Sequence, residues 1–398
     1  MAFLRHGCRV AAICPPGHPL RLVDGIETIY AYEGIDSLGS LKAAITTAKP
    51  DLIVPCDDGI VWQLHHIHES SPAHRAIIER SLGPAEHYAT VRSRAQFLLA
   101  AQEMDIRIPA TQTIASRDQI EAWPFEFPAV LKLDGTWGGS GVAIVRSREE
   151  ALAAFDRLST PAGVGTAIKR LAINSDPLAL WSLRGREKSS VSMQQYIPGR
   201  PANTMMVCWN GHMLANISVE ALSAQGATGA ATVVRVIDHP EIDQAARLTA
   251  FRFQLTGCYG LDFILEEETD AAYLIELNPR ATQLGHLRLA GQGDLAGLLA
   301  EQLGATAGEL PGDAHTSDCH ISSAIAFFPQ AFHWNSKSPY LRTAYHDVPW
   351  EQPHLLHELL KPIWPHRQFL YRLYHRLRPF HQQSEAKFDE VPKAVTVR

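Results

Sequence analysis

Apolar and polar positions over the first 85 residues predict short buried strands that alternate with helices. The apolar runs CRVAAIC (8–14) and DLIVPC (51–56) end at or beside a proline, which is typical of short buried parallel strands bounded by turns. Between them, SLGSLKAAITTAKP (37–50) has the apolar spacing of a helix that stops at Pro50. This alternation predicts a small, open α/β unit over residues 1–85.

The opening residues MAFLRHG (1–7) resemble the end of a helix that leads into the apolar run at Cys8. A doubly wound α/β unit begins with a strand rather than with the end of a helix. We therefore expect a Rossmann-like unit whose first strand, with the loop after it, is missing because the chain starts late.

Hairpin signals dominate residues 86–305. Helices are expected from Ser93 and over residues 240–255, and the pair Asn210-Gly211 predicts a tight hairpin turn. Strands are expected at FPAVLKL (127–133), VAIVRS (142–147), SVSMQQYI (190–197), ATVVRVI (231–237) and along the hairpin GLDFILEEETDAAYLIELNPR (260–280). The region is therefore predicted to be an α+β domain with mostly antiparallel strands.

Residues 306–398 are rich in proline, histidine and aromatic side chains. They predict a C-terminal extension that is partly helical. Its basic, amphipathic tail (361–380) leaves two interpretations open, packing on the body of the protein or contact with a membrane or a partner.

Composition limits the class of protein. With 46% hydrophobic and 20% charged residues the chain is typical of a soluble globular protein, and its net charge of −6 gives no electrostatic case for nucleic acid. No apolar run reaches the roughly 18 to 20 residues of a membrane span, so no stable membrane insertion is expected. The six cysteines form no Cys-x-x-Cys pair, which favours buried thiols in a reducing, cytoplasmic compartment. We expect a cytoplasmic protein with small-molecule partners, and a homo-oligomer stays open.

The hairpin at 260–280 carries the first candidate chemistry. Thr269 lies midway between Asp262 and Glu276, so the two carboxylates are predicted to face each other across the strand pair. Asn278 projects from the same face as Glu276 because it follows two residues later. Such oxygen-only ligands suit Mg²⁺ or Mn²⁺. The alternative is that Arg280 or a lysine neutralises a structural carboxylate pair.

The stretch LKLDGTWGGSG (131–141) carries the second candidate. It lacks the order of a P-loop or of a dinucleotide-binding loop, because its lysine precedes the glycines on a strand. Backbone N–H groups of such a loop can cover a triphosphate while Lys132 supplies positive charge from below. The alternative is a plain mobile hairpin tip.

Taken together, these segments resemble the ATP-grasp superfamily, and most closely the large-chain type of carbamoyl-phosphate synthase. The resemblance covers residues 86–305, in the order RSRAQF, PAVLKLDGTWGGSGVAIV, QQYIPG, GATGAATVVRV, and GLDFI with IELNPRAT. It implies a pre-ATP-grasp α/β domain over residues 1–85 and an α+β ATP-grasp domain over 86–305, followed by the extension 306–398.

The resemblance also implies ligands for ATP and magnesium. It assigns Arg94, Lys132, Gly138, Gly139 and Ser140 to the phosphates, and Gln195, Tyr196 and Ile197 to the adenine. It assigns Asp262, Glu276 and Asn278 to the metal and Arg280, with Lys132, to catalysis. Ala202 replaces the carboxylate that commonly binds the ribose, so the nucleotide contacts depart from the family there.

Enzymes of this type are ADP-forming ligases that activate a carboxylate as an acyl phosphate, which an amine then attacks. We therefore expect a carboxylate–amine ligase with small-molecule carboxylate and amine substrates. A non-catalytic ATP-binding regulatory protein and a Mg-ATP small-molecule kinase are the alternatives.

The acceptor site is less defined by the sequence. Asp57 and Asp58 follow a predicted strand and could hold an amine or a hydroxyl, but Asp58 could equally cap the next helix. Arg235 could face a substrate carboxylate or form a surface ion pair. His65 and His68 share a helix face but lack a third ligand nearby, which favours a solvated surface over a zinc site.

Overall fold

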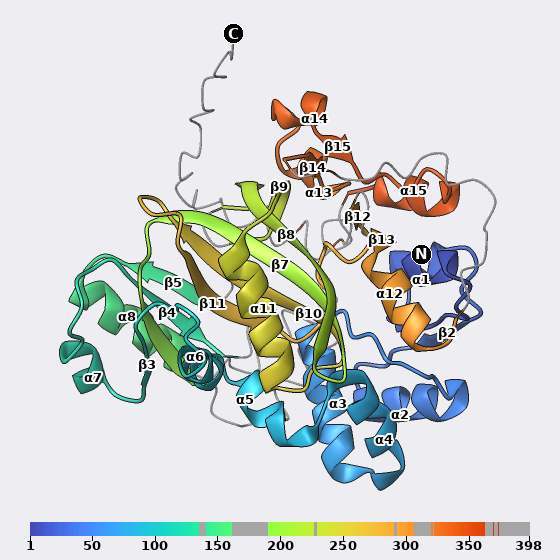
Figure 1. The fold of residues 1–398 in the computed structure, drawn as a ribbon, viewed down its shortest axis with the longest axis horizontal. Helices are drawn as coiled ribbons and strands as arrows, with labels where there is room; N and C mark the ends of the chain where they lie inside the picture. Colours follow the sequence, from blue (N-terminus) through green and yellow to red (C-terminus); the bar gives the residue numbers. More distant parts are fainter. Residues whose placement is uncertain are drawn as a thin grey trace.

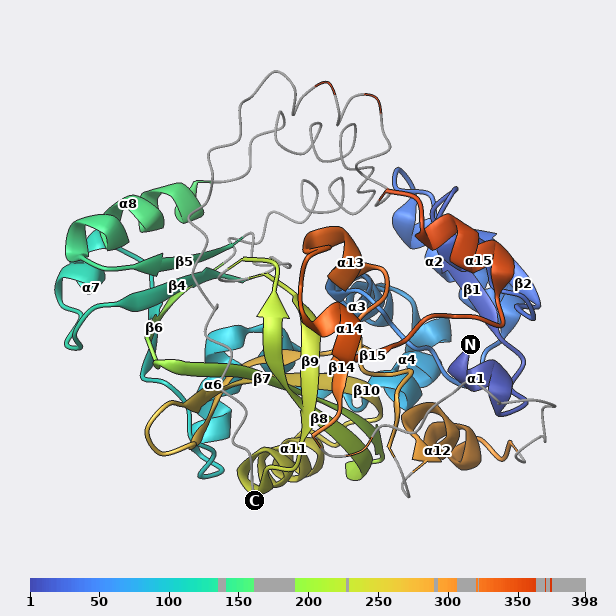
Figure 2. The same ribbon diagram turned by 90° about the horizontal axis from the view of Figure 1, so that it is seen from above.

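A computed structural model describes residues 1–134, 141–160, 190–226, 229–289, 293–305, 320, 322–362, 369 and 373. Within these residues the chain forms an N-terminal α/β region, a small antiparallel sheet, a large central sheet and a set of short C-terminal elements. The small sheet and the N-terminal elements lie at opposite ends of the molecule, with the large sheet between them (Figures 1 and 2).

The N-terminal region is built around one short parallel strand pair. Strand β1 (Ala11–Cys14) pairs with β2 (Thr28–Ala31), and the predicted helix over 37–50 is α2 (Ser37–Ala48). Asp36 caps α2, and the helix ends at Lys49 in a left-handed conformation before Pro50. The remaining helices of this region are α1 (Ala2–Arg5), η1 (Pro19–Leu22), α3 (Asp58–Ser70), η2 (Pro72–His74), α4 (Arg75–Leu82), η3 (Ala85–His87) and α5 (Tyr88–Arg92).

The predicted strand at 51–56 is wrong. Among the described residues no strand pairs with it, and its backbone groups are satisfied in other ways. The amide of Ile53 donates to the Ser81 hydroxyl at 2.9 Å, and the carbonyl of Pro55 accepts from the Ala281 amide at 3.0 Å. The apolar pattern correctly marks partly buried residues, but burial alone does not make a strand.

The small sheet has the strand order β3-β6-β4-β5, and all its pairs are antiparallel. Its strands are β3 (Thr111–Ile114), β4 (Ala129–Leu133), β5 (Val142–Val145) and β6 (Val191–Gln195). Helices α7 (Arg117–Glu121) and α8 (Arg148–Ser159) pack on one face of it around Leu131 and Met193. The other face is left for the cleft toward the large sheet.

The large sheet has the order β11-β10-β7-β8-β9-β14-β15. Its strands are β7 (Gly199–Trp209), β8 (His212–Ala224), β9 (Ala231–Ile237), β10 (Gly257–Glu266), β11 (Ala272–Asn278), β14 (Ala324–Ala326) and β15 (Tyr345–His346). The β7–β8 turn is at Asn210-Gly211, as predicted, with φ angles of 48° and 81°. The predicted α/β region followed by a mostly antiparallel α+β region is therefore present.

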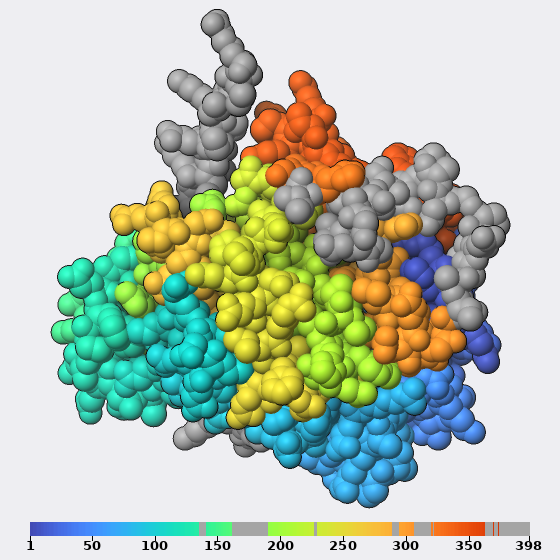
Figure 3. Space-filling view, in the orientation of Figure 1, coloured from blue at the N-terminus to red at the C-terminus, as the bar shows by residue number. Residues whose placement is uncertain are grey.

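Helices cover one face of the large sheet. Helix α11 (Pro240–Arg252) and helix α6 (Arg94–Gln102) pack there, and α11 is exposed on the face of the molecule that Figure 3 shows. The residues of the opposite face of the sheet form a second core with α12 (Leu295–Gln302).

C-terminal elements contact the beginning of the chain. The C-terminal elements not yet named are β12 (Arg288–Leu289), β13 (Gly293–Asp294), α13 (Gln330–Trp334), α14 (Tyr340–Thr343) and α15 (Pro353–Leu359). His6 bonds Asp294 at 2.9 Å, and the amide of Asp24 donates to Gln352 at 2.7 Å. The predicted amphipathic tail lies almost entirely outside the described residues. Within the described residues, every helix falls short of the length and apolarity that a membrane crossing requires.

Candidate functional site

A cavity of about 530 Å³ lies between the small sheet, the large sheet and α3. The sequence-predicted site residues that line it are Asp58, Arg94, Lys132, Gln195, Tyr196, Ile197, Asp262, Glu276, Asn278 and Arg280. Residues 135–140, which include Gly138, Gly139 and Ser140, lie outside the described residues. One cavity is therefore lined by residues from all five segments that the resemblance links.

The carboxylate hairpin has the predicted register. Asp262 on β10 pairs with Glu276 on β11, and Gly260 pairs with Asn278. A β-bulge between Asp262 and Phe263 shifts the pairing beyond this point by one residue. The direct pairing of Asp262 with Glu276 puts both carboxylates on the cavity face, while Leu261, beside Asp262, belongs to the α11 core.

The two facing carboxylates differ in their partners. Burial and the nearby charge of Glu276 raise the pKa of Asp262, although the amides of Asn203 and Asn278 donate to its oxygens. Burial would also raise the pKa of Glu276, but Arg94 and Lys132 outweigh it and lower that pKa. Asp262 is therefore the carboxylate that lacks a cationic hydrogen-bond partner among the described residues.

Lys132 and Arg94 bring positive charge beneath the hairpin. Nζ of Lys132 donates to the carbonyl of Ile275 at 3.4 Å, and Nη2 of Arg94 donates to Oε1 of Glu276 at 2.6 Å. Burial lowers the pKa of Lys132 to about 8 against the attraction of the nearby carboxylates. Both side chains are buried, so their charges act in a medium of low dielectric constant.

Asp134 is a site residue that the sequence analysis did not select. Its carboxylate accepts from Nη1 of Arg94 at 3.3 Å and from the Ser190 hydroxyl at 2.7 Å. Burial raises its pKa. Asp134 directly follows the β4 strand that carries Lys132, and that position was the available signal.

Arg280 connects the hairpin to the N-terminal region. Its Nε donates to Oδ2 of Asp58 at 2.9 Å, and its Nη2 donates to Oδ1 of Asn278 at 3.3 Å. Asp57, not Asp58, caps α3, because its carboxylate accepts from the Gly59 amide at 2.7 Å. The capping alternative for Asp58 is therefore wrong, and Asp58 is the one of the two that lines the cavity.

The opposite end of the cavity contains the residues predicted to contact the base. Gln195, Tyr196 and Ile197 line it, but the alternation of β6 points the side chain of Gln194 into the cleft. Nε2 of Gln194 is buried and has no hydrogen-bond partner among the described residues. Such an amide is suited to bind a polar ligand atom. The sequence signal for it was the alternation of Gln194 with the apolar Val191 and Met193, which pack on the α8 side.

Arg235 lies away from the cavity lining. Its Nε donates to Glu220 at 2.5 Å, and the residue is not among those that line the cavity. The ion-pair interpretation of Arg235 is therefore favoured over a substrate contact. Ala202 pairs with Glu220 across β7 and β8, and it belongs to the α11 core while also bordering the cavity.

The histidines of α3 are not placed as a metal site. His65 stacks on Tyr88 with ring centroids 3.9 Å apart and is buried, while Nε2 of His68 bonds Glu79 at 2.8 Å. The predicted solvated surface is thus wrong for His65, because the ring packs in the N-terminal core, and that burial lowers its pKa to about 3.

The hairpin residues fit a hard divalent cation. Two facing carboxylates, one of them with a pKa raised by burial and by its neighbour, need positive charge, and the donors are oxygen atoms. Among the described residues no group of three His, Cys, Asp or Glu side chains could hold a metal. An incomplete protein cage of this kind suits Mg²⁺, which keeps waters and binds phosphate oxygens. Asp262, Glu276 and Asn278 would hold it.

Comparison with known proteins identifies the domain. The family model described as ATP-grasp domain matches residues 102–283. A search of curated protein sequences finds no match.

Solved structures share the fold at low sequence identity. The biotin carboxylase domain of 2-oxoglutarate carboxylase from Hydrogenobacter thermophilus, solved with ADP, magnesium and bicarbonate, is 13% identical with a TM-score of 0.57, over 81% of this chain and 69% of that chain. N5-carboxyaminoimidazole ribonucleotide synthetase from Thermus thermophilus is 15% identical with a TM-score of 0.53, over 81% and 78%. Biotin carboxylase from Campylobacter jejuni is 13% identical with a TM-score of 0.53, over 81% and 72%. Residues 102–283 of this chain therefore form an ATP-grasp domain.

Proposed function

We propose that this protein is an ATP- and Mg²⁺-dependent, ADP-forming ligase that joins a carboxylate to an amine through an acyl phosphate. One observation carries the proposal: a single cavity combines the facing carboxylates of Asp262 and Glu276 with the cations of Lys132, Arg94 and Arg280. The ATP-grasp match and the ADP complexes of structural relatives support it.

The charges of the cavity suit phosphoryl transfer. A carboxylate is a poor electrophile because oxide is a poor leaving group, whereas phosphate leaves readily. Lys132, Arg94 and Arg280 would neutralise phosphate oxygens as negative charge shifts from the γ- to the β-phosphate. When bound by Asp262, Glu276 and Asn278, Mg²⁺ supplies further charge compensation at these oxygens.

Burial would protect the intermediate. The small sheet and the large sheet close the cavity from two sides, so water has restricted access to an acyl phosphate formed there. The glycine stretch at 135–141 stays a predicted lid over the phosphates.

An ADP-release screen with amino acids and other carboxylates, each paired with amines, tests the proposal. ADP release that needs both substrates supports the ligase, and Glu276→Gln is the inactive control. ATP binding without turnover would indicate a regulatory protein. A stable phosphorylated product that yields no hydroxamate with hydroxylamine would indicate a kinase.

A further inference from the structure

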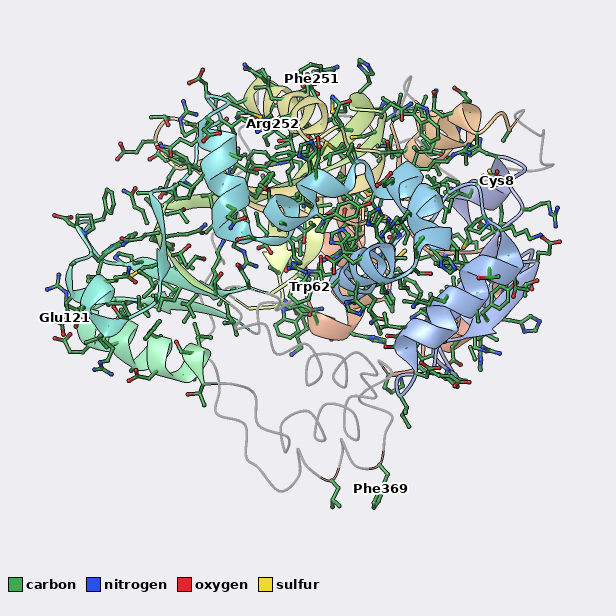
Figure 4. The ribbon with its side chains drawn as sticks, turned by 90° about the horizontal axis from the view of Figure 1, so that it is seen from below. Cys8, Trp62, Glu121, Phe251, Arg252 and Phe369 are labelled. Atoms are coloured by element: carbon green, nitrogen blue, oxygen red, sulfur yellow. The ribbon has the colours of Figure 1, made fainter. Side chains whose placement is uncertain are left out.

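Part of the cavity lining combines an ion pair with apolar side chains. We call this part of the lining the acceptor end, and we define it by Asp58, Arg280 and Thr282 together with the apolar wall. The apolar wall consists of Val219, Val234, Leu284 and Phe327. Trp62, which projects from α3 toward the middle of the molecule, also lines the cavity (Figure 4).

Asp58 and Arg280 form an ion pair that a ligand can reach. Nε of Arg280 lies 2.9 Å from Oδ2 of Asp58, and both side chains are 23% exposed. Asp58 is the first residue of the 13-residue helix α3, whose N-terminus favours a negative charge there. The pair is therefore accessible but fixed in place.

A ligand that carries charge of only one sign competes poorly with the ion pair between Asp58 and Arg280. A bare carboxylate that takes Arg280 leaves Asp58 partly buried without its partner, which is costly. A zwitterion avoids this cost because its carboxylate pairs with Arg280 while its ammonium pairs with Asp58. Thr282, two residues after Arg280, also lines the cavity, and its buried Oγ1 has no hydrogen-bond partner among the described residues.

The apolar wall determines which kind of ligand side chain can bind beside the ion pair. Val219, Val234, Leu284 and Phe327 are each at most 3% exposed and belong to one core cluster. The same cluster packs against residues of the segment that leads to Asp58. A polar side chain placed on this wall would lose its hydration without gaining hydrogen bonds.

We propose that the activated carboxylate belongs to an α-amino acid with an apolar side chain, and this inference rests on the proposed ligase function. The carboxylate oxygen attacks the γ-phosphorus, the bond to the β,γ-bridging oxygen breaks, and ADP leaves. An amine nitrogen then attacks the acyl carbon and loses a proton as the carbon–oxygen bond to phosphate breaks. The α-ammonium stays on Asp58 throughout and is not the nucleophile.

Hydroxamate formation from three acceptors tests this specificity. The full chain is given ATP, Mg²⁺, hydroxylamine and either leucine, 4-methylpentanoate or asparagine. The second compound lacks only the ammonium of leucine, and the third has a polar side chain of nearly the same shape. We expect kcat/KM to favour leucine about 10- to 100-fold over 4-methylpentanoate and about tenfold over asparagine.

Asp58→Asn separates ammonium binding from a positioning effect on Arg280. Loss of the ammonium contact lowers the ratio of leucine to 4-methylpentanoate toward one, whereas a displaced Arg280 slows both acceptors equally. Asp156→Asn is the matched control, because it breaks an ion pair to Arg117 whose side chains are both 54% exposed. The preference for leucine over 4-methylpentanoate and the preference for leucine over asparagine should both be unchanged in Asp156→Asn.

Equal use of leucine and 4-methylpentanoate by the unaltered protein would overturn the inference and leave the ligase intact. A ratio that persists in Asp58→Asn would overturn it as well. Absence of hydroxamate from every carboxylate would instead overturn the proposed function. In that case calorimetry with leucine and MgADP decides the acceptor end, since binding that is lost in Asp58→Asn supports the zwitterion site and no binding contradicts it.

Discussion

Lys132 combines burial with the positive charge that the proposed phosphate binding requires. Burial lowers its pKa to about 8, so the free protein holds the ammonium form below that pH and loses it above. In the unfolded chain the pKa has its ordinary value of 10.5, so burying the charged form destabilises the folded protein below about pH 8. That cost disappears as the pH rises from about 8 to 10.5. The ionisation of Lys132 should also be visible in function.

We expect kcat/KM for ATP to be level up to about pH 8 and to fall at higher pH, since this parameter reports the free enzyme. Lys132→Arg keeps the charge to a much higher pH, so the alkaline decline should move upward in that variant. Steady-state kinetics from about pH 6 to 10 measure both profiles. A profile that stays level through about pH 9 would refute the assignment of the charge to Lys132.

Neutralising Glu276 and neutralising Asp262 should lower the unfolding free energy of the protein by different amounts. Glu276→Gln removes one of the two carboxylates that pair with Arg94 and should cost about 2 kcal/mol of unfolding free energy, because the pair is largely but not fully buried. Asp262→Asn relieves repulsion and should cost no more than about 1 kcal/mol. Both variants should lose Mg²⁺-dependent ADP formation. Denaturant unfolding without metal measures the difference, and equal costs would contradict the distinct environments.

At the scale of elements, the hairpin β10–β11 holds the candidate site together. Its register was predictable because the polar turn fixes the centre of symmetry and one face is buried. The extended segment at 51–56 was not predictable in the same way, since pairing with another strand is a tertiary property. Gln195 was selected from the resemblance and lines the cavity, whereas Gln194, which the alternation of β6 could have indicated, was not selected.

Gly260 tests how closely the hairpin and the segment after Arg280 must approach. An added Cβ would lie 2.5 Å from Cγ2 of Thr282 and 3.4 Å from Cβ of Asn278. Gly260→Ala should lower the unfolding free energy by about 1 to 3 kcal/mol and reduce ADP formation at least about tenfold. Gly304→Ala is the control, because Gly304 has a φ of 78° but an added Cβ would meet no atom of the described residues within 4 Å. It should cost only about 1 kcal/mol and leave activity unchanged. Normal activity in Gly260→Ala would argue against tight packing.

At the scale of the whole molecule, contacts far apart in sequence place the N-terminal region on the ATP-grasp domain. Arg280 bonds Asp58, 222 residues earlier, and His6 bonds Asp294. The sequence predicted most elements of both regions, but local patterns carry no information on which distant side chains meet. The boundaries at 85/86 and 305/306 stay predictions.

Replacing Asp294 should lower the unfolding free energy more than replacing His6. Its carboxylate accepts from the Gly297 amide at 2.6 Å as the cap of α12 and also bonds His6. Asp294→Ala should cost about 2 kcal/mol, the larger part from the buried cap, while His6→Ala should cost about 1 kcal/mol. Thermal unfolding measures both, and a larger loss in His6→Ala would show that the link to α1 outweighs the cap.

Transfer of oxygen from the carboxylate to phosphate tests the central claim most directly. A carboxylate substrate labelled with ¹⁸O at both carboxylate oxygens is incubated with the protein, ATP, Mg²⁺ and an amine, and the released phosphate is analysed by mass spectrometry. Activation as an acyl phosphate predicts one ¹⁸O atom in each phosphate formed, because the attacking carboxylate oxygen leaves with the phosphorus. Release of ADP with unlabelled phosphate would contradict the account.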